Sequence, residues 1–219
     1  MLLSELRTQL ARYARKMYES ELVRATQGNL SARDPDSALI CITPSGTDYQ
    51  TLTAEDIVVV DEQGTVVEGQ WQPSVETPLH TLILRRRRDI NCVMHTHSTY
   101  ASAFGVIYQP IPMILAESAS CLGGPVPIAP YCMSGTPEFA ELVAQTLGDG
   151  PAVIWGNHGA MVVGINLALT FSIAHALEDT ARIYAIAKQL GTPVTLPTDE
   201  VSKLHDLWRA NYRQKSLSE

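Results

Sequence analysis

Short β-branched runs and longer amphipathic segments alternate irregularly along this chain, and this alternation constrains the fold more than any other feature. The runs ALICIT (38–43), DIVVVD (56–61) and GTVVEG (64–69) are typical of strands, and the PSG and DEQG that separate them are typical of turns. Helical and extended patterns do not follow a regular strand–helix–strand order. The sequence therefore predicts a mixed α/β domain, not a regular β-α-β repeat.

Helical spacing of apolar residues predicts five helices, over 2–22, 75–88, 98–106, 167–190 and 198–213. Ser74 and Ser98 are the expected N-caps of the second and third helices, and Gly191 ends the fourth. Two other stretches predict buried strands. INCVMHTH (90–97) forms one strand, and AVIWGNHGAMVVG (152–164) forms two strands joined at GNHG.

Length, charge and cysteine usage narrow the class of protein. The 219 residues are enough for one domain with a buried core, which we expect over 1–219. A net charge of −7 argues against nucleic acid or an anionic membrane as the main partner, but allows a small anionic substrate. The charged N-terminal segment is unlike a signal peptide, and no apolar run approaches the roughly 20 residues that span a bilayer. The four cysteines stand singly, as expected for reduced thiols, and these features together predict a cytoplasmic protein.

Two histidines at the end of a predicted strand raise the question of a metal site. Residues i and i+2 of a strand point to the same face, so His95 and His97 can converge on one ion. His158 stands between a Gly-Asn pair and a glycine in WGNHGA, where a turn would expose its ring. Glu76 lies at the start of the predicted helix that precedes the His-x-His strand. Three histidines and a carboxylate are a plausible ligand set for zinc or another divalent transition metal.

Plainer interpretations of the same residues stay open. A His-x-His pair occurs by chance, and a histidine beside glycine can serve only as a turn residue. The other three histidines, His80, His175 and His205, lie on predicted helices, where we expect them at the edge of the core or on the surface.

Three turn-like stretches carry the residue types that bind phosphate. They are TQGNLS (26–31), TPSGTD (43–48) and QPSVE (72–76), each of which combines backbone amides with small hydroxyl or amide side chains. Glycine, asparagine, proline and serine are also the ordinary residues of turns, so each stretch is weak evidence alone. Their combination with the histidines favours a phosphorylated substrate.

The chain resembles the class II aldolase/adducin-head family. The resemblance is carried by TQGNLSAR, ITPSGTDYQTLTAEDIVVVD, PSVETPLH, VMHTHSTYASAF, IAPYCMSGT and NHGAMVVG, which follow one another in the family's order from about residue 5 to 190. It implies a three-layer α/β/α sandwich with a central mixed, mainly antiparallel sheet. It also implies a homotetramer with active sites at the subunit boundaries.

The resemblance assigns roles to residues that match the family's motifs. It implies that His95, His97 and His158 bind the catalytic metal, usually Zn²⁺, and that Glu76 is both the acid/base and a metal ligand when no substrate is bound. A phosphate pocket is implied at six positions: Gly28, Asn29, Ser45, Gly46, Ser74 and Val75.

The chain departs from the family's fuculose-phosphate aldolases in the same region. Val75 stands where those enzymes have a second serine, so one hydroxyl donor to phosphate is missing, although the Val75 N–H remains. The aldehyde-side tyrosine is absent from MILAESASCLGG, where Glu117 could replace it or serve only as a helix-cap or interface carboxylate. Tyr212 resembles a second tyrosine that closes the site.

The resemblance implies a zinc-dependent aldolase that cleaves a ketose 1-phosphate, of fuculose or deoxypentulose type, into dihydroxyacetone phosphate and an aldehyde. The chemistry agrees, since the enediolate left by cleavage needs a Lewis acid and a carboxylate that returns a proton. Three alternatives stay open. One is an epimerase similar to L-ribulose-5-phosphate 4-epimerase, and another is a non-enzymatic adducin-head-like module, a group that has typically lost the metal ligands. The third is a related decarboxylase that acts on a sugar-acid phosphate.

Overall fold

The computed structural model describes residues 1–215, with the side chains of residues 1–211. Within this part the chain forms the helices α1 (Ser4–Glu19), α2 (Thr77–Arg86), α3 (Thr99–Val106), α4 (Ala116–Leu122), α5 (Pro137–Leu147), α6 (Leu167–Leu190) and α7 (Thr198–Lys215). The strands are β1 (Asn29–Arg33), β2 (Ile40–Ile42), β3 (Val58–Val60), β4 (Val66–Glu68), β5 (Cys92–Thr96), β6 (Ile128–Ala129), β7 (Ala152–Trp155) and β8 (Ala160–Gly164).

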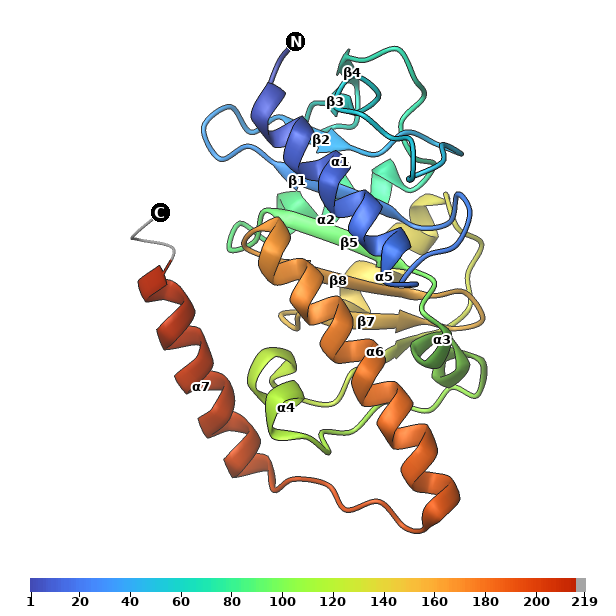
Figure 1. Ribbon diagram of the computed structural model, residues 1–219, viewed down its shortest axis with the longest axis vertical. Coiled ribbons are helices and arrows are strands. Elements are labelled where there is room, and N and C mark those ends of the chain that lie inside the picture. Colours follow the sequence, from blue (N-terminus) through green and yellow to red (C-terminus); the bar gives the residue numbers. More distant parts are fainter. Residues whose placement is uncertain (216–219) are drawn as a thin grey trace.

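The strands form one sheet in the order β4-β3-β2-β1-β5-β8-β7-β6 (Figure 1). Neighbouring strands are antiparallel except β6 and β7, which are parallel. Strand β5 lies in the middle of the sheet, with Asn29 of β1 opposite His95 on one side and Met161 of β8 opposite it on the other. The mixed, mainly antiparallel sheet that the resemblance implied is therefore confirmed.

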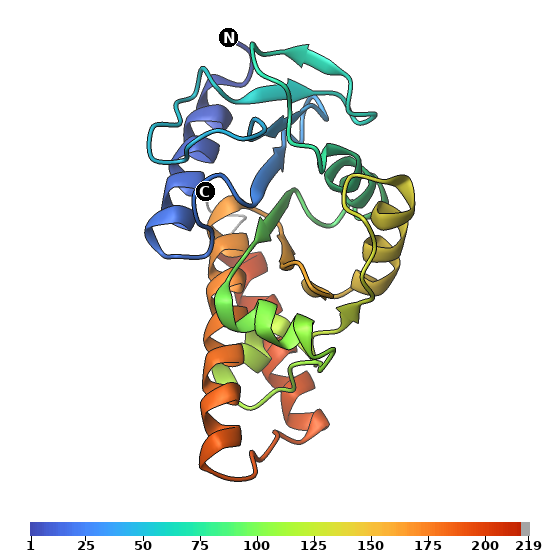
Figure 2. The same ribbon diagram turned by 90° about the vertical axis from the view of Figure 1, so that its right-hand side faces the viewer.

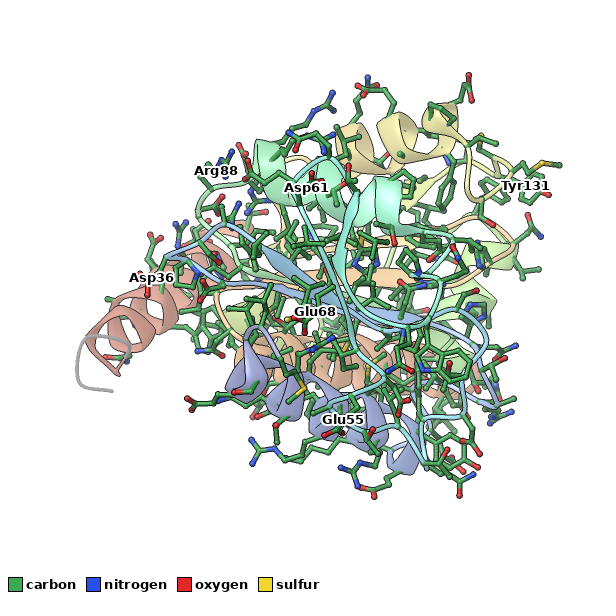
Figure 3. All side chains as sticks on the ribbon, turned by 90° about the horizontal axis from the view of Figure 1, so that it is seen from above. Asp36, Glu55, Asp61, Glu68, Arg88 and Tyr131 are labelled. Carbon is green, nitrogen blue, oxygen red and sulfur yellow. The ribbon has the colours of Figure 1, made fainter. Side chains whose placement is uncertain are left out.

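Helices cover both faces of this sheet and give three layers. Helices α1, α3, α4 and α6 lie on one side, and α2 and α5 lie on the other, as Figures 2 and 3 show from two directions. Each interface has its own apolar cluster, centred on residues such as Met94 and Leu177 in one and on Val93 and Trp155 in the other. Because both faces of the central strands are covered, β5 and β8 are buried along their whole length.

Local patterns predicted several elements well. Helix α6 begins at Leu167 and ends at Leu190, with Gly191 at its C-cap, as expected. Strands β7 and β8 form the antiparallel pair predicted on either side of GNHG. The two predicted serine caps have different outcomes. Ser74 is not the N-cap of α2, which begins only at Thr77 with Glu76 at the N-cap. Ser98 does occupy the N-cap of α3, but its side chain makes no capping hydrogen bond.

The carboxylate of Glu178 on α6 takes over the capping of α3. Its two oxygens accept the backbone N–H groups of Tyr100 and Ala101, at 2.8 and 2.9 Å. A side chain from another helix thus satisfies the donors that Ser98 was expected to cap.

Four elements were not predicted, namely β1, α4, β6 and α5. The start of helix α5 could have been predicted from the Thr136–Pro137 pair. Thr136 is the N-cap and its side chain accepts the N–H of Phe139, and Pro137 occupies the first helical position. The sequence of β1 suggested a turn.

All four cysteines are free, three of them buried and Cys132 half-buried. No helix in the described part of the chain is long and apolar enough to cross a membrane.

Candidate metal centre and active site

The three predicted histidine ligands lie together at one end of the sheet. His95 is at the end of β5, His97 follows it, and His158 is on the turn between β7 and β8. The ring centres of His95 and His97 are 4.7 Å apart, and His158 is 5.0 Å from each of them. One nitrogen from each ring lies within 4.8 Å of the others, a spacing that one metal ion can bridge.

The β7–β8 turn brings His158 close to β5 because two of its residues, Asn157 and Gly159, allow a sharp change of chain direction. Asn157 has a φ of 57°, in the left-handed region that asparagine tolerates. A Cβ on Gly159 would lie 2.3 Å from the carbonyl oxygen of Thr96 and 2.9 Å from the Cε1 atom of His95. Glycine is therefore required at 159 for the turn to approach β5 closely.

The His95 ring is held with one nitrogen aimed at the cluster. Its Nδ1 is 2.9 Å from the carbonyl oxygen of Ala160, which can only accept, so Nδ1 carries the proton. The other nitrogen, Nε2, is buried and has no hydrogen-bond partner within the described residues. The indole of Trp155 stacks on the ring at 4.1 Å. An orphaned basic nitrogen whose opposite N–H is bound to a carbonyl is the arrangement of a metal-ligating histidine.

The environment keeps these rings neutral, as metal ligation requires. Burial, together with the neighbouring rings of the cluster, lowers the pKa of both His95 and His97 to about 3. Burial also lowers the pKa of His158, although the nearby Glu76 carboxylate opposes this effect.

Glu76 adds a carboxylate to the three histidines. Its Oε2 lies 3.6 Å from His95 Nε2 and its Oε1 lies 3.9 Å from His158 Nε2, with the side chain only 4% exposed. Burial raises the pKa of Glu76, and a hydrogen bond from Asn29 at 2.9 Å partly offsets this rise. A bound cation would also lower it. The residues present thus fit a divalent ion, with three nitrogens and one carboxylate as its ligands.

His80 is a part of the site that sequence reasoning missed. It was expected at the core edge or surface, but it is fully buried. Its ring lies between Ser31 Oγ, 2.7 Å from Nδ1, and Asn29 Oδ1, 2.5 Å from Nε2. Burial lowers its pKa to about 3. A signal was available, because His80 follows Glu76 by four residues and therefore lies on the same face of α2.

Two of the predicted phosphate-binding turns lie side by side. Residues Pro44 and Pro73 form an isolated antiparallel bridge. The Ser45 N–H donates to Gln72 O at 2.9 Å, and the Ser74 N–H donates to Thr43 O at 3.2 Å. These amides are therefore engaged within the protein.

The remaining donors of these turns are suited to an anion. The Ser74 hydroxyl accepts from the Glu76 N–H at 3.3 Å, and a hydroxyl that accepts one bond can still donate another. The Gly28–Asn29 segment, at the start of β1, adjoins this region, because Thr43 bonds to Leu30 through both its backbone and its hydroxyl.

Comparison with known proteins agrees with this geometry. Residues 8–185 match the model of the Class II Aldolase and Adducin N-terminal domain. The chain is 35% identical over 204 residues to the 5-deoxy-D-ribulose 1-phosphate aldolase of Bacillus thuringiensis, a match that covers 93% of this chain and 95% of the relative. The chain belongs to the class II aldolase and adducin family.

Other members of the class II aldolase and adducin family are similar over most of the chain. The L-fuculose phosphate aldolase of Escherichia coli is 35% identical over 179 residues, which are 82% of each chain. A solved structure of an L-fuculose 1-phosphate aldolase superposes with a TM-score of 0.92 at 36% identity and covers 95% of this chain and 98% of its own.

Two residues that the family resemblance suggested stay predictions. Glu117 is exposed in the first turn of α4, a helix that packs against α6 and α7, whereas the metal-site side chains come from α2, β5 and the β7–β8 turn. Tyr212 belongs to α7, but its side chain lies outside the described residues.

Proposed function

We propose that this protein is a metal-dependent class II aldolase that reversibly cleaves a ketose 1-phosphate into dihydroxyacetone phosphate and an aldehyde. The observation that carries the proposal is the buried Glu76 carboxylate, 3.6 Å from the unpartnered His95 Nε2, in a chain 35% identical to aldolases for sugar 1-phosphates. Zinc is the ion we expect, because nitrogen-rich sites with one carboxylate suit it. The sugar is of the deoxypentulose or fuculose type, after the relatives' names.

The chemistry divides between the ion and the side chains. When bound, a divalent ion supplies Lewis-acid stabilisation of the negative charge that develops on the ketone and its neighbouring hydroxyl. The three histidines, kept neutral by burial, are the residues that would hold it. Their enclosure beneath Trp155 and against β8 keeps water away from one side of the site.

Glu76 moves the proton. The hydroxyl on the carbon that becomes the aldehyde gives its proton to a base on the aldehyde side, the role predicted for Glu117. The carbon–carbon bond then breaks, its electron pair passes into the ketone fragment, and the aldehyde departs. The Glu76 carboxyl then gives a proton to the carbon next to the ketone, and its carboxylate removes this proton in the synthetic direction. The Asn29 side chain holds one oxygen of Glu76 in place for this transfer.

The substrate phosphate is proposed to bind between the Gly28–Asn29, Ser45–Gly46 and Ser74–Val75 turns. The N-terminus of α2 supports this placement, because its first turn directs backbone dipoles towards the same region. Val75 is 66% exposed and can offer only its N–H, so the pocket relies on the hydroxyls of Ser45 and Ser74.

We further infer a homotetramer with its active sites at subunit boundaries, in the cytoplasm. Three apolar side chains support the boundary, since Val106, Ile107 and Tyr108 at the end of α3 are 56%, 60% and 46% exposed, and α3 directly follows His97. Four free cysteines agree with a reducing compartment. Analytical ultracentrifugation tests the tetramer.

Proton exchange tests the function directly. With dihydroxyacetone phosphate alone in deuterated water, the metal-loaded protein should exchange one proton stereospecifically. Glu76→Gln should still fold and bind metal but exchange at least about 100-fold more slowly. Glu117→Gln should exchange at the wild-type rate, because the role predicted for Glu117 is on the aldehyde side and no aldehyde is present. If Glu76→Gln exchanged the proton at the wild-type rate, a residue other than Glu76 would have to transfer it. Failure to cleave any of a panel of ketose 1-phosphates would overturn the aldolase itself.

A further inference from the structure

A buried chain of hydrogen bonds leads from β1 through α2 to the active-site carboxylate. It runs from Ser31 Oγ to His80 Nδ1 at 2.7 Å, from His80 Nε2 to Asn29 Oδ1 at 2.5 Å, and from Asn29 Nδ2 to Glu76 Oε2 at 2.9 Å. All four residues are at least 94% buried. Water therefore cannot substitute freely for any of these partners.

The chemistry of the four groups sets the direction of every bond. The ionised Glu76 carboxylate, the form that binds a cation, can only accept, so the Asn29 amide must present its NH₂ group to it. The Asn29 carbonyl oxygen then faces His80 and requires a donor, so His80 must carry its proton on Nε2. This leaves His80 Nδ1 as an acceptor, which the Ser31 hydroxyl fills. The opposite set of directions would place two acceptors, the Asn29 carbonyl and the Glu76 carboxylate, 2.9 Å apart.

We propose that His80 is a positioning residue: as the Nε2–H tautomer it locks the Asn29 amide, which in turn holds the Glu76 carboxylate towards the histidine cluster. The inference rests on the proposed function in taking Glu76 as the proton carrier and metal ligand. His80 itself touches neither the metal site nor the proposed substrate. Without its donor, the Asn29 amide can flip, and a flipped amide repels the carboxylate that it now binds.

Two substitutions of similar size separate this role from simple core filling. In His80→Gln the amide NH₂ can reach the place of Nε2 and still donate to Asn29. In His80→Asn the shorter amide can satisfy Ser31 at the place of Nδ1 but leaves Asn29 without its donor. If His80 only filled space, the two variants would differ only in melting temperature, according to the volume that each side chain leaves empty. Their metal affinity and exchange rate would then be the same.

Metal affinity and proton exchange are the readouts. Zn²⁺ affinity is measured by competition with a chromophoric chelator, and exchange is measured on dihydroxyacetone phosphate. His80→Asn should lose 10- to 100-fold in affinity or exchange rate, the usual effect of removing an outer partner of a metal site. His80→Gln should stay within about threefold of wild type, a difference small beside that loss. Equal losses in both variants, or no loss in either, would overturn the proposal.

The wild-type protein provides a test that needs no variant to fold. Nitrogen-15 NMR of histidine-labelled protein distinguishes the two neutral tautomers, and His80 should be protonated on Nε2. A proton on Nδ1 would overturn the proposal. Zinc affinity and the tautomer are both measured without substrate, so they are independent of the reaction. If no ketose 1-phosphate is cleaved but the two variants still separate in zinc affinity, the aldolase proposal fails and the role of His80 stands.

Discussion

The metal-free protein should lose stability when the pH falls from 7 to 5.5, because the fold holds three imidazole rings neutral. Burial lowers the pKa of His80, His95 and His97 from 6.5 to about 3. In the unfolded chain the same rings take up protons near pH 6.5. The unfolded state thus binds more protons between about pH 6.5 and 3. The contribution of the neutral rings to the free energy of unfolding is fully present above this window and is lost as the pH falls through it.

The magnitude follows from the two protonation states. Between pH 7 and 5.5 an unfolded histidine passes from about one quarter to about nine tenths protonated, while the buried ring stays neutral. Integration gives a loss of about 1.3 kcal/mol for each histidine, or about 4 kcal/mol for the three. Glu76 acts in the opposite sense, because burial raises its pKa and the folded state then gains a proton on acidification. The loss from the histidines alone is a large part of the 5–15 kcal/mol typical of a domain.

The contribution of His80 can be isolated by difference. Urea unfolding is measured at pH 7 and pH 5.5 on metal-stripped wild type and on His80→Gln, which has one buried ring fewer. The contributions of Glu76 and of the three histidines of the cluster are common to both proteins and cancel. The variant should therefore lose about 1.3 kcal/mol less than wild type between the two pH values. If wild type and variant lost the same free energy of unfolding between the two pH values, the fold would not hold His80 neutral, and burial would not lower its pKa.

Three further substitutions test the site. His97→Ala should reduce the bound metal, measured by mass spectrometry, from about one ion per chain to near zero while the circular dichroism spectrum is unchanged. Asn29→Asp should raise KM at least about tenfold for a ketose 1-phosphate, by placing a negative charge against the phosphate, and less for an unphosphorylated sugar, which is affected only through the lost bond to Glu76. Gly159→Ala should weaken Zn²⁺ binding at least about tenfold, because its Cβ would lie 2.3 Å from a backbone oxygen of β5. Gly191→Ala is its control, since a Cβ there meets nothing within 4 Å.

Strand β1 shows why part of the fold could not be predicted. Its sequence, NLSAR, does alternate, with apolar Leu30 and Ala32 facing one core cluster. The polar residues between them suggested a turn, yet they are buried against α2 and its C-terminal end. Asn29 and Ser31 bond to His80, and Arg33 donates to the carbonyl oxygen of Leu84. These partners are about 50 residues away in the chain, so no local pattern reveals them. Helix α6, in contrast, has 24 residues of helical pattern and a terminal glycine, and was predicted to the residue.

The same distinction separates the predicted metal ligands from the residues that support them. The convergence of His95 and His97 could be predicted because residues two apart in an extended segment share a face, whatever the rest of the chain does. His158 needed only its glycine-flanked turn. The burial of His80 could not be predicted, because it depends on which strand α2 covers. A polar residue on a helix is assigned to the surface unless the strand beneath supplies its partners.

The register of the central strands is what assembles the site. Because Asn29 is opposite His95 across β1 and β5, both side chains point to the face that α2 covers, where Glu76 and His80 meet them. A slip of one residue between these strands would turn His95 to the opposite face and separate it from Glu76. The alternating apolar residues of β5, Val93 on this face and Met94 on the other, oppose such a slip because each is packed in its own core cluster. The packing that stabilises the sheet therefore also holds the ligands in place, and a core substitution that loosens the β1–β5 register should reduce metal affinity before it unfolds the protein.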